Sequence, residues 1–171
     1  MKTTVIKIVL ITILFMSATY NWNNDYQKSL IEDNKVLAAF SAWGYTGEHV
    51  DSTVKNSDYD AILRKGDKTY TIEIKNDWRA AGTQNFFVET GNANGKPSGL
   101  TTSKASHTVF TMPQNNILLA LKTEDLRALI NDNDFREMNK PTMGVLIPVT
   151  AIANSTTCVT KTYKSIMKEL I

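Results

Sequence analysis

Two carboxylates and a lysine occupy a segment whose pattern is otherwise that of a β-hairpin. The segment DYDAILRKGDKTYTIEIK, residues 58–75, alternates apolar and polar side chains on both sides of Gly66-Asp67, a pair common in two-residue turns. A turn centred on that pair places Asp60 opposite Glu73. Because alternate residues of a strand share a face, we expect Asp60, Glu73 and Lys75 on one side of the hairpin.

This arrangement suits a divalent cation. Directly opposed strand residues have β-carbons roughly 4.5–5.5 Å apart, and like charges at that separation destabilise the pair. A shared proton or a cation stabilises two such carboxylates, and a neighbouring lysine can orient water or an anionic substrate. Cys158 is the only cysteine and there are two histidines, so a metal would be held mainly by oxygen ligands, which favours Mg²⁺, Mn²⁺ or Ca²⁺. The alternative is a hairpin whose outer face carries solvated charges.

The surrounding pattern predicts one α/β domain over residues 21–171, because a chain of 171 residues has room for a single substantial core. A helix is expected over residues 26–43, with Tyr26, Leu30, Leu37 and Phe40 on one face. A second helix, 123–132, is expected to begin with Thr123 as its N-cap. The other expected elements are strands at 58–64, 69–75, 85–90, 107–112, 116–122 and 143–150, and a basic amphipathic helix at 161–171.

Residues 1–20 form a separate apolar segment. Lys2 and Lys7 precede the apolar run 8–16, a pattern typical of a signal peptide and too short for a comfortable membrane span. Two further interpretations stay open, namely a true start of translation at Met16 and a buried strand. The first interpretation makes the protein exported or membrane-anchored through residues 1–18. The other two leave it in the cytoplasm of the host cell, which is the location we expect.

The order of the acidic and basic residues resembles the core of the PD-(D/E)xK nuclease superfamily. The matching residues are Asp60 and then Glu73-Ile74-Lys75, while Tyr59 stands where that family usually has a proline. The resemblance implies a restriction-endonuclease-like α/β core, with a mixed β-sheet of about four to six strands flanked by helices. It also implies that Asp60, Glu73 and Lys75 are catalytic, and that Asp60, Glu73 and the Ile74 carbonyl hold Mg²⁺ or Mn²⁺.

Many members of this superfamily also place an acidic residue of the first helix near the metal. Glu32 and Asp33 are the candidates in the helix expected at 26–43. On a helical wheel Asp33 falls within the apolar face and Glu32 points away from it. A charge on an apolar face is costly unless it is paired or metal-bound, so we choose Asp33 as the additional metal residue.

The segment from Gly82 to Ala105 is similar to one that follows the Glu-x-Lys strand in phage-type members. The matches are Thr83, Asn85, Glu89, Ser98, Gly99, Thr102 and Ala105, whereas Gln84 and Ser106 replace a glycine and an aspartate of the pattern. This resemblance implies accessory or phosphate-binding roles for Asn85, Glu89, Ser98 and Thr102, and neighbouring Lys104 is a further phosphate-binding candidate.

The sequence therefore predicts a Mg²⁺- or Mn²⁺-dependent nuclease that hydrolyses phosphodiester bonds of DNA, without a small-molecule cofactor. The net charge of +2 permits a polyanionic partner, but no block of Lys and Arg argues for one. Duplex, single-stranded and branched DNA all remain open as substrates, and so does a homodimer. The alternatives are a non-catalytic nucleic-acid-binding module that kept the nuclease fold, and an exported or membrane-tethered cation-binding protein.

Overall fold

The computed structural model describes residues 22–50, 58–139, 141–155 and 157–162. The apolar segment 1–20 and residues 163–171 of the expected C-terminal helix lie outside this part of the chain. In chain order the elements are α1 (Trp22–Ala42), β1 (Thr46–His49), β2 (Ala61–Lys65), β3 (Lys68–Asn76), α2 (Ala80–Thr83), β4 (Asn85–Gly91), the 3-10 helix η1 (Gly99–Thr101), β5 (His107–Met112), β6 (Ile117–Lys122), α3 (Thr123–Asn131), β7 (Arg136–Met138), β8 (Met143–Pro148), α4 (Val149–Ala153) and β9 (Val159–Thr162).

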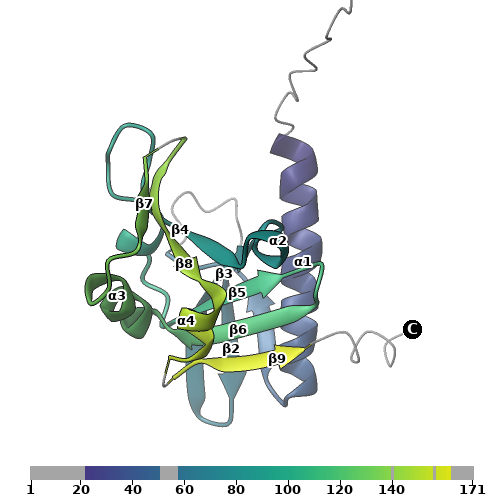
Figure 1. The fold of residues 1–171 in the computed structure, drawn as a ribbon. Helices are drawn as coiled ribbons and strands as arrows, with labels where there is room; N and C mark the ends of the chain where they lie inside the picture. The colour runs from purple at the N-terminus through teal and green to yellow at the C-terminus, as the bar shows by residue number, and fades with distance from the viewer. Residues whose placement is uncertain (1–21, 51–57, 140, 156, 163–171) are drawn as a thin grey trace, which may run out of the picture.

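The main sheet has six strands in the order β1-β2-β3-β5-β6-β9. The β3–β5 pair is parallel and the other pairs are antiparallel, so the sheet is mixed, as expected for an α/β fold of four to six strands flanked by helices. The connection from β3 to β5 runs through α2, β4 and η1. Strand β4 leaves the main sheet and pairs with β8 in a second sheet of order β4-β8-β7, which the sequence pattern did not predict (Figure 1).

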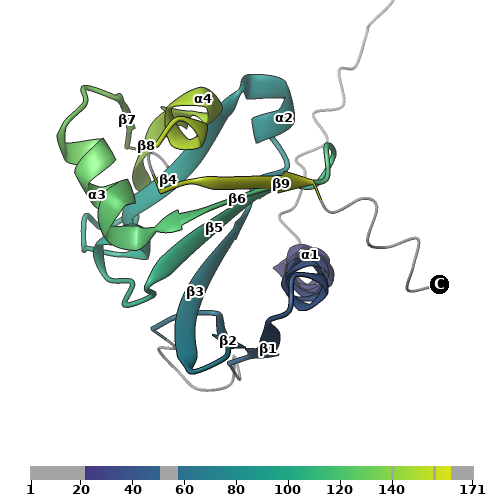
Figure 2. The same ribbon diagram turned by 90° about the horizontal axis from the view of Figure 1, so that it is seen from below.

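Each face of the main sheet carries its own apolar core. Figure 2 shows α1 against one face, with the second sheet, α3 and α4 on the other. On the α1 side, Val36, Ala39 and Phe40 pack against residues of β2, β3, β5 and β6 that include Ile72 and Ile74. On the opposite side, the fully buried cluster includes Phe86, Phe110, Leu119, Leu121, Leu126, Ile147 and Ile152. Burying a large apolar side chain contributes about 1.5–3 kcal/mol, so the core on the α1 side, which includes Ile72 and Ile74, stabilises β3 in the middle of the sheet.

The hairpin forms with the predicted turn and register. Gly66 has a φ of +57°, the left-handed backbone that a tight hairpin turn requires and that glycine adopts without strain. Lys65 pairs with Lys68, and the regular ladder continues to the pair Ala61–Ile72. Asp60 lies just beyond that last pair, and its backbone N–H donates to the carbonyl of Ile72 at 2.9 Å.

The contact face of α1 agrees with the predicted one only in part, because Phe40 is buried and Leu37 packs against the same core, whereas Tyr26 is not part of it. The buried residues are Glu32, Val36, Ala39 and Phe40, whereas Tyr26 is 40% exposed. Figure 1 shows the N-terminal turns of α1 extending past the main sheet. Val36 and Ala39 join Leu37 and Phe40 in the core on this side of the sheet, so the contact face includes residues that the predicted face did not.

Two further predictions about elements are wrong. Thr123 does not cap α3: its hydroxyl lies 3.0 Å from the hydroxyl of Thr108, and the N-cap position is Lys122. A buried hydroxyl takes the nearest polar partner, and here that partner is on β5. The expected C-terminal helix does not begin at Lys161, because Lys161 and Thr162 belong to β9, which pairs with β6.

Candidate active site

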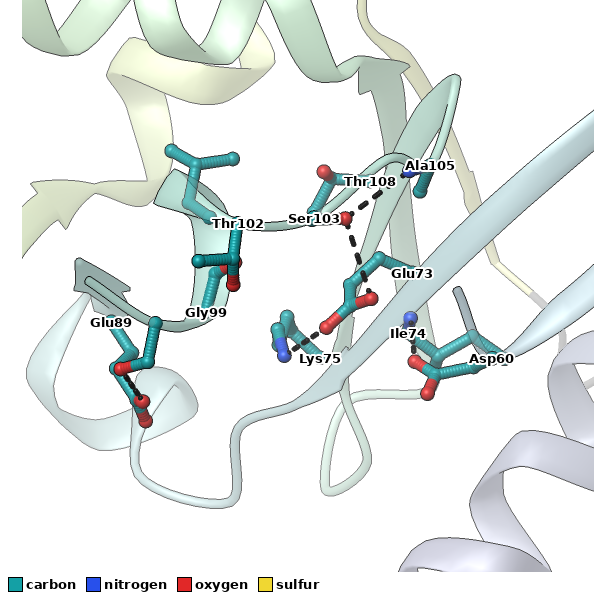
Figure 3. Close-up of polar contacts among 12 residues, drawn as sticks. Asp60, Glu73, Ile74, Lys75, Glu89, Gly99, Thr102, Ser103, Ala105 and Thr108 are labelled. Atoms are coloured by element: carbon teal, nitrogen blue, oxygen red, sulfur yellow. Dashed lines mark hydrogen bonds and ion pairs between the residues drawn. The ribbon is translucent and has the colours of Figure 1, made fainter. Parts of the chain in front are cut away.

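Glu73 and Lys75 project from the same face of β3 and form an ion pair. Their neighbours Ile72 and Ile74 point to the opposite face and are 1% and 7% exposed. The ammonium of Lys75 donates a hydrogen bond to Oε1 of Glu73, as Figure 3 shows. The Glu73 side chain is 15% exposed and that of Lys75 is 37% exposed, so the carboxylate is largely shielded and the lysine side chain is only partly exposed.

Asp60 lies against the same strand. Its Oδ2 accepts a hydrogen bond of 2.6 Å from the backbone N–H of Ile74. Burial raises the pKa of Asp60 to about 6, and the negative charge of Glu73 adds to the rise, against the opposing effects of the Ile74 N–H and Lys75. A carboxylate with a raised pKa binds a proton or a cation more readily than an exposed one, so this position favours positive charge.

Lys75 is surrounded by negative charge. Burial alone would lower the pKa of its ammonium, but Glu73, Asp60 and Glu89 outweigh that effect and the pKa is raised. Lys75 therefore stays protonated through the physiological pH range. Its chemistry at this site is that of a fixed positive charge and hydrogen-bond donor, and not that of a base.

Asp33 lies on the other side of β3. Its Oδ1 accepts a hydrogen bond of 2.7 Å from the side chain of Asn76, a residue that follows Ile72 and Ile74 on the α1 side of the strand. Burial, with a smaller contribution from Glu32, raises the pKa of Asp33 to about 6. Asp33 adds to the rise in the pKa of Asp60, as the smallest of its causes, and the positive charge of Lys75 opposes the rise at both carboxylates.

The helical wheel predicted that Glu32 points away from the apolar face of α1, and this prediction is wrong. Glu32 is 6% exposed and forms an ion pair with Lys35. The wheel placed the contact face of α1 too far from this residue. The preference for Asp33 rests instead on its observed neighbours, Asn76 and Lys75.

Asn76 ties three elements together beneath the site, and the sequence analysis missed it. Its amide donates to Oγ of Ser29 on α1 at 3.1 Å and to Asp33, while its Oδ1 accepts from Oγ1 of Thr111 on β5 at 2.7 Å. The end of β3 is thus fixed to both α1 and β5. Asn76 directly follows Lys75 in the chain, but no sequence pattern distinguishes it from a solvated strand-end residue.

Glu89 and Ser98 are brought together beside Lys75. Oγ of Ser98 donates to Oε1 of Glu89 at 2.6 Å, and Glu89 contributes to the raised pKa of Lys75. Gly99 has a φ of +56°, and a Cβ at this position would lie 2.5 Å from the backbone oxygen of Glu89. Only glycine allows the loop to approach β4 this closely, which explains the residue at position 99, and Figure 3 shows Gly99 beside Glu89 at the edge of the site.

The other accessory candidates lie in local structure. The Asn85 side chain donates to the backbone oxygen of Thr83 at 2.7 Å, within the turn that joins α2 to β4. Gln84 in that turn has a φ of +56°, so it adopts the backbone conformation that a glycine would adopt easily. The Thr102 hydroxyl donates to Gly99 within the η1 loop at 3.3 Å, and Lys104 pairs with Asp58 at 2.9 Å. Neither Thr102 nor Lys104 contacts the carboxylates of the site.

Two residues that the sequence analysis did not select support Glu73. Oγ of Ser103 donates to Oε2 of Glu73 at 3.5 Å. Arg127 of α3 donates to the backbone oxygens of Leu100 and Ser103 at 2.9 and 2.6 Å, and so holds the η1 loop against the site. Both contacts join segments that are distant in the sequence, and no local signal predicts them.

A groove of about 700 Å³ begins at Lys75 and runs along the ends of β3, β4 and β8. Arg79, Asn85 and Phe87 line it, together with Leu146 of β8. Lys75 therefore contacts the carboxylate of Glu73 and also lines the groove. A substrate in the groove would pass directly beside that carboxylate.

The donor chemistry of the site fits a hard divalent cation. The side chains of Asp60 and Glu73 and the carbonyl of Ile74 could supply oxygen ligands, and burial together with the negative charge of Glu73 raises the pKa of Asp60. Among the described residues, no group of three or more His, Cys, Asp and Glu side chains is arranged to hold a metal ion.

Comparisons with models of known protein families, with curated proteins and with solved structures found no match to this chain. In the part of the chain that the structure describes, no helix is both long and apolar enough to cross a membrane.

Proposed function

We propose that this protein is a metal-dependent nuclease of the PD-(D/E)xK type that hydrolyses phosphodiester bonds of DNA. The observation that carries the proposal is the grouping of Asp60, Glu73 and Lys75 around the backbone of Ile74, with Asp60 bonded to the Ile74 N–H. An aspartate at the end of one hairpin strand and a Glu-x-Lys on the next is the arrangement expected for this type of site.

The surrounding elements also support the proposal. Helix α1 packs against β2 and β3, and β3 pairs in parallel with β5. A helix followed by an antiparallel hairpin and a mixed sheet is what a restriction-endonuclease-like core requires. The three-stranded β4-β8-β7 sheet is an addition to that plan, and it forms one wall of the groove beside Lys75.

The residues have distinct roles in the proposed reaction. Asp60, Glu73 and the carbonyl of Ile74 would hold Mg²⁺ or Mn²⁺, with Asp33 adding negative charge from the α1 side. When bound, the metal lowers the pKa of a water molecule and stabilises charge on the scissile phosphate. Lys75 stays protonated, so it stabilises developing negative charge on the phosphate and orients the attacking water.

The ion pair between Lys75 and Glu73 would affect the binding of a divalent cation at this site. Lys75 supplies the positive charge that the carboxylates lack when no cation is bound. Binding of a divalent cation at Glu73 would free the ammonium of Lys75 to face the groove and the phosphate. Ser103 would help to orient the Glu73 carboxylate with or without a cation, because its hydroxyl donates to the other oxygen.

A cleavage assay tests the proposal. Plasmid, linear duplex, branched and single-stranded DNA are incubated with the wild-type protein in Mg²⁺, Mn²⁺ or EDTA, and the same panel is run with Asp60→Asn and Glu73→Gln. We expect cleavage with either metal, none in EDTA and a loss of at least about a hundredfold in each variant. Glu137→Gln, an exposed change on β7, controls for the loss of a carboxylate as such, since it should cleave like wild type.

Cleavage that survives in both Asp60→Asn and Glu73→Gln would show that the activity comes from elsewhere. If folded wild-type protein cleaves none of these substrates in either metal, the non-catalytic nucleic-acid-binding module becomes the better interpretation.

A further inference from the structure

We infer that the groove beside Lys75 binds single-stranded DNA, with bases against an apolar wall and a phosphate at Arg79. The inference deepens the proposed function and depends on it, because a phosphodiester substrate is what makes DNA the occupant. It names the form of the substrate, which neither the sequence nor the cluster of carboxylates specifies.

The wall of the groove is mostly apolar. Phe87 of β4 and Leu146 of β8 are paired residues on neighbouring strands, and Met138 and Pro141 extend the same surface. The ring of Phe87 lies over Gly144, where a Cβ would come within 2.6 Å of two ring carbons. Because Gly144 has no side chain, the ring of Phe87 packs directly on the backbone of β8, at the wall of the groove.

An apolar wall of this kind suits bases rather than phosphates. Single strands expose the faces of their bases, and a base stacked on an aromatic ring is stabilised by about 1–3 kcal/mol. A duplex stacks its bases internally and presents phosphates at its surface. In this groove its negatively charged phosphates would contact the apolar side chains of Phe87 and Leu146. The volume of about 700 Å³ is typical of a pocket that encloses a ligand of nucleotide size.

The charges in the groove favour the same occupant. Lys75 and Arg79 are the cations of its lining, and Lys75 is already surrounded by Glu73, Asp60 and Glu89. Arg79 is exposed and has no carboxylate partner among the residues that the structure describes. One free guanidinium can anchor one phosphate of a single strand, whereas duplex binding draws its affinity from many phosphate contacts.

A single carboxylate positions both binding residues. Oδ1 of Asp77 accepts from the backbone N–H groups of Arg79 and Ala80 at 2.8 and 3.0 Å, and Oδ2 accepts from that of Phe87 at 3.2 Å. Asp77 thus sets the phosphate anchor and the aromatic ring relative to each other and to the end of β3. With its oxygens directed at backbone N–H groups, Asp77 acts as a positioning residue of the groove.

Fluorescence anisotropy with a labelled oligonucleotide of about 12 nucleotides tests this inference, with the same sequence also presented as a blunt duplex. Titrations are run in Ca²⁺, which holds the metal position while supporting little cleavage. We expect the single strand to bind at least about tenfold more tightly than the duplex. Arg79→Gln should weaken single-strand binding about fivefold and reduce the slope of log K against log salt by about 0.7.

Phe87 is tested by a matched pair of variants. Phe87→Leu keeps an apolar side chain but removes the ring face, and it should weaken single-strand binding about tenfold, whereas Phe87→Tyr should stay within about twofold of wild type. Lys68→Gln is the charge control for Arg79→Gln, because it removes one exposed positive charge at the opposite end of β3. Thermal unfolding of each variant shows whether the fold is retained, and Arg79→Gln remains decisive if Phe87→Leu fails to fold.

Equal or tighter binding of the duplex would overturn the inference, as would equal effects of Arg79→Gln and Lys68→Gln. Cleavage in Mg²⁺ is scored separately. Duplex cleavage without single-strand preference would leave the nuclease standing and remove this inference. Selective single-strand binding through Arg79 and Phe87, without cleavage of any substrate, would instead support the groove and remove the nuclease.

Discussion

Oδ2 of Asp60 lies 2.6 Å from the backbone nitrogen of Ile74, the residue that separates Glu73 from Lys75. This contact spans the end of the hairpin, one residue beyond the last regular pair of β2 and β3. It holds the aspartate at the strand that carries the other two charged residues. The bond also leaves the second oxygen of Asp60 available to a cation.

The raised pKa of Asp60 predicts how the metal-free protein responds to pH. A folded-state pKa of about 6 exceeds the ordinary aspartate pKa of 3.8, so between these values the folded protein retains a proton that the unfolded chain releases. The resulting stability is complete below about pH 4 and is lost as the pH rises through about 6. One pKa unit corresponds to about 1.4 kcal/mol, so the ceiling on this loss is about 3 kcal/mol.

We therefore expect Asp60→Asn to be more stable than wild type in EDTA at pH 7.5, by about 1–2 kcal/mol, and to match it at pH 4. Chemical denaturation at both pH values measures the difference. Mg²⁺ at pH 7.5 should stabilise wild type and not the variant. Asp134→Asn, an exposed change near the end of α3, should show no such dependence on pH. A constant difference between Asp60→Asn and wild type at the two pH values would contradict the assignment.

Lys75→Ala should separate metal binding from turnover. Without the ammonium, Glu73 loses its ion-pair partner, and the carboxylates keep more of their attraction for a divalent cation. We expect calorimetry to show Mn²⁺ affinity at least equal to that of wild type, while cleavage falls by about a hundredfold. Glu73→Gln should lose both properties. Wild-type cleavage by Lys75→Ala would exclude the role proposed for the lysine.

Gly99→Ala should be strongly destabilising because two costs coincide. The backbone has a positive φ, and the new Cβ would lie 2.5 Å from the oxygen of Glu89. Gly66→Ala shares the positive φ but has no atom within 4 Å, and Gly82→Ala has neither problem. In denaturant unfolding we expect Gly99→Ala to lower the free energy of unfolding by about 3 kcal/mol or more. Gly66→Ala should lower it by about 1 kcal/mol, and Gly82→Ala should leave it nearly unchanged. Equal losses for Gly99→Ala and Gly66→Ala would show that the loop does not press on β4.

Arg127→Met should loosen the loop that supports Glu73. The substitution keeps the length of the side chain but removes the hydrogen bonds to Leu100 and Ser103. Two partly buried carbonyls then lose their donor, at a cost of about 1–3 kcal/mol. Hydrogen exchange should accelerate over residues 98–104, and cleavage should fall by about tenfold. Arg136→Met, an exposed change on β7, is the control, and unchanged exchange in Arg127→Met would refute the anchoring role.

Local rules in the sequence were sufficient for the hairpin and for most strands. The Gly66-Asp67 turn and the alternation on either side of it specify register through neighbours in the chain, and the observed pairs Lys65–Lys68 and Ala61–Ile72 agree with that prediction. The strands that begin at His107 and Met143 also follow from local apolar pattern. These features depend on interactions within a few residues, which periodicity and turn chemistry describe well.

The remaining parts of the site depend on contacts between distant segments. The sequence pattern cannot show that β4 leaves the main sheet for β8, since an apolar strand suits either partner. Nor can it show that Asn76 meets Asp33, that Ser103 meets Glu73, or that Arg127 holds the η1 loop. Such contacts join positions 24 to 43 residues apart. They form because the two cores bring α1, β3 and α3 together, and burial then requires each polar group to find whichever partner lies nearest.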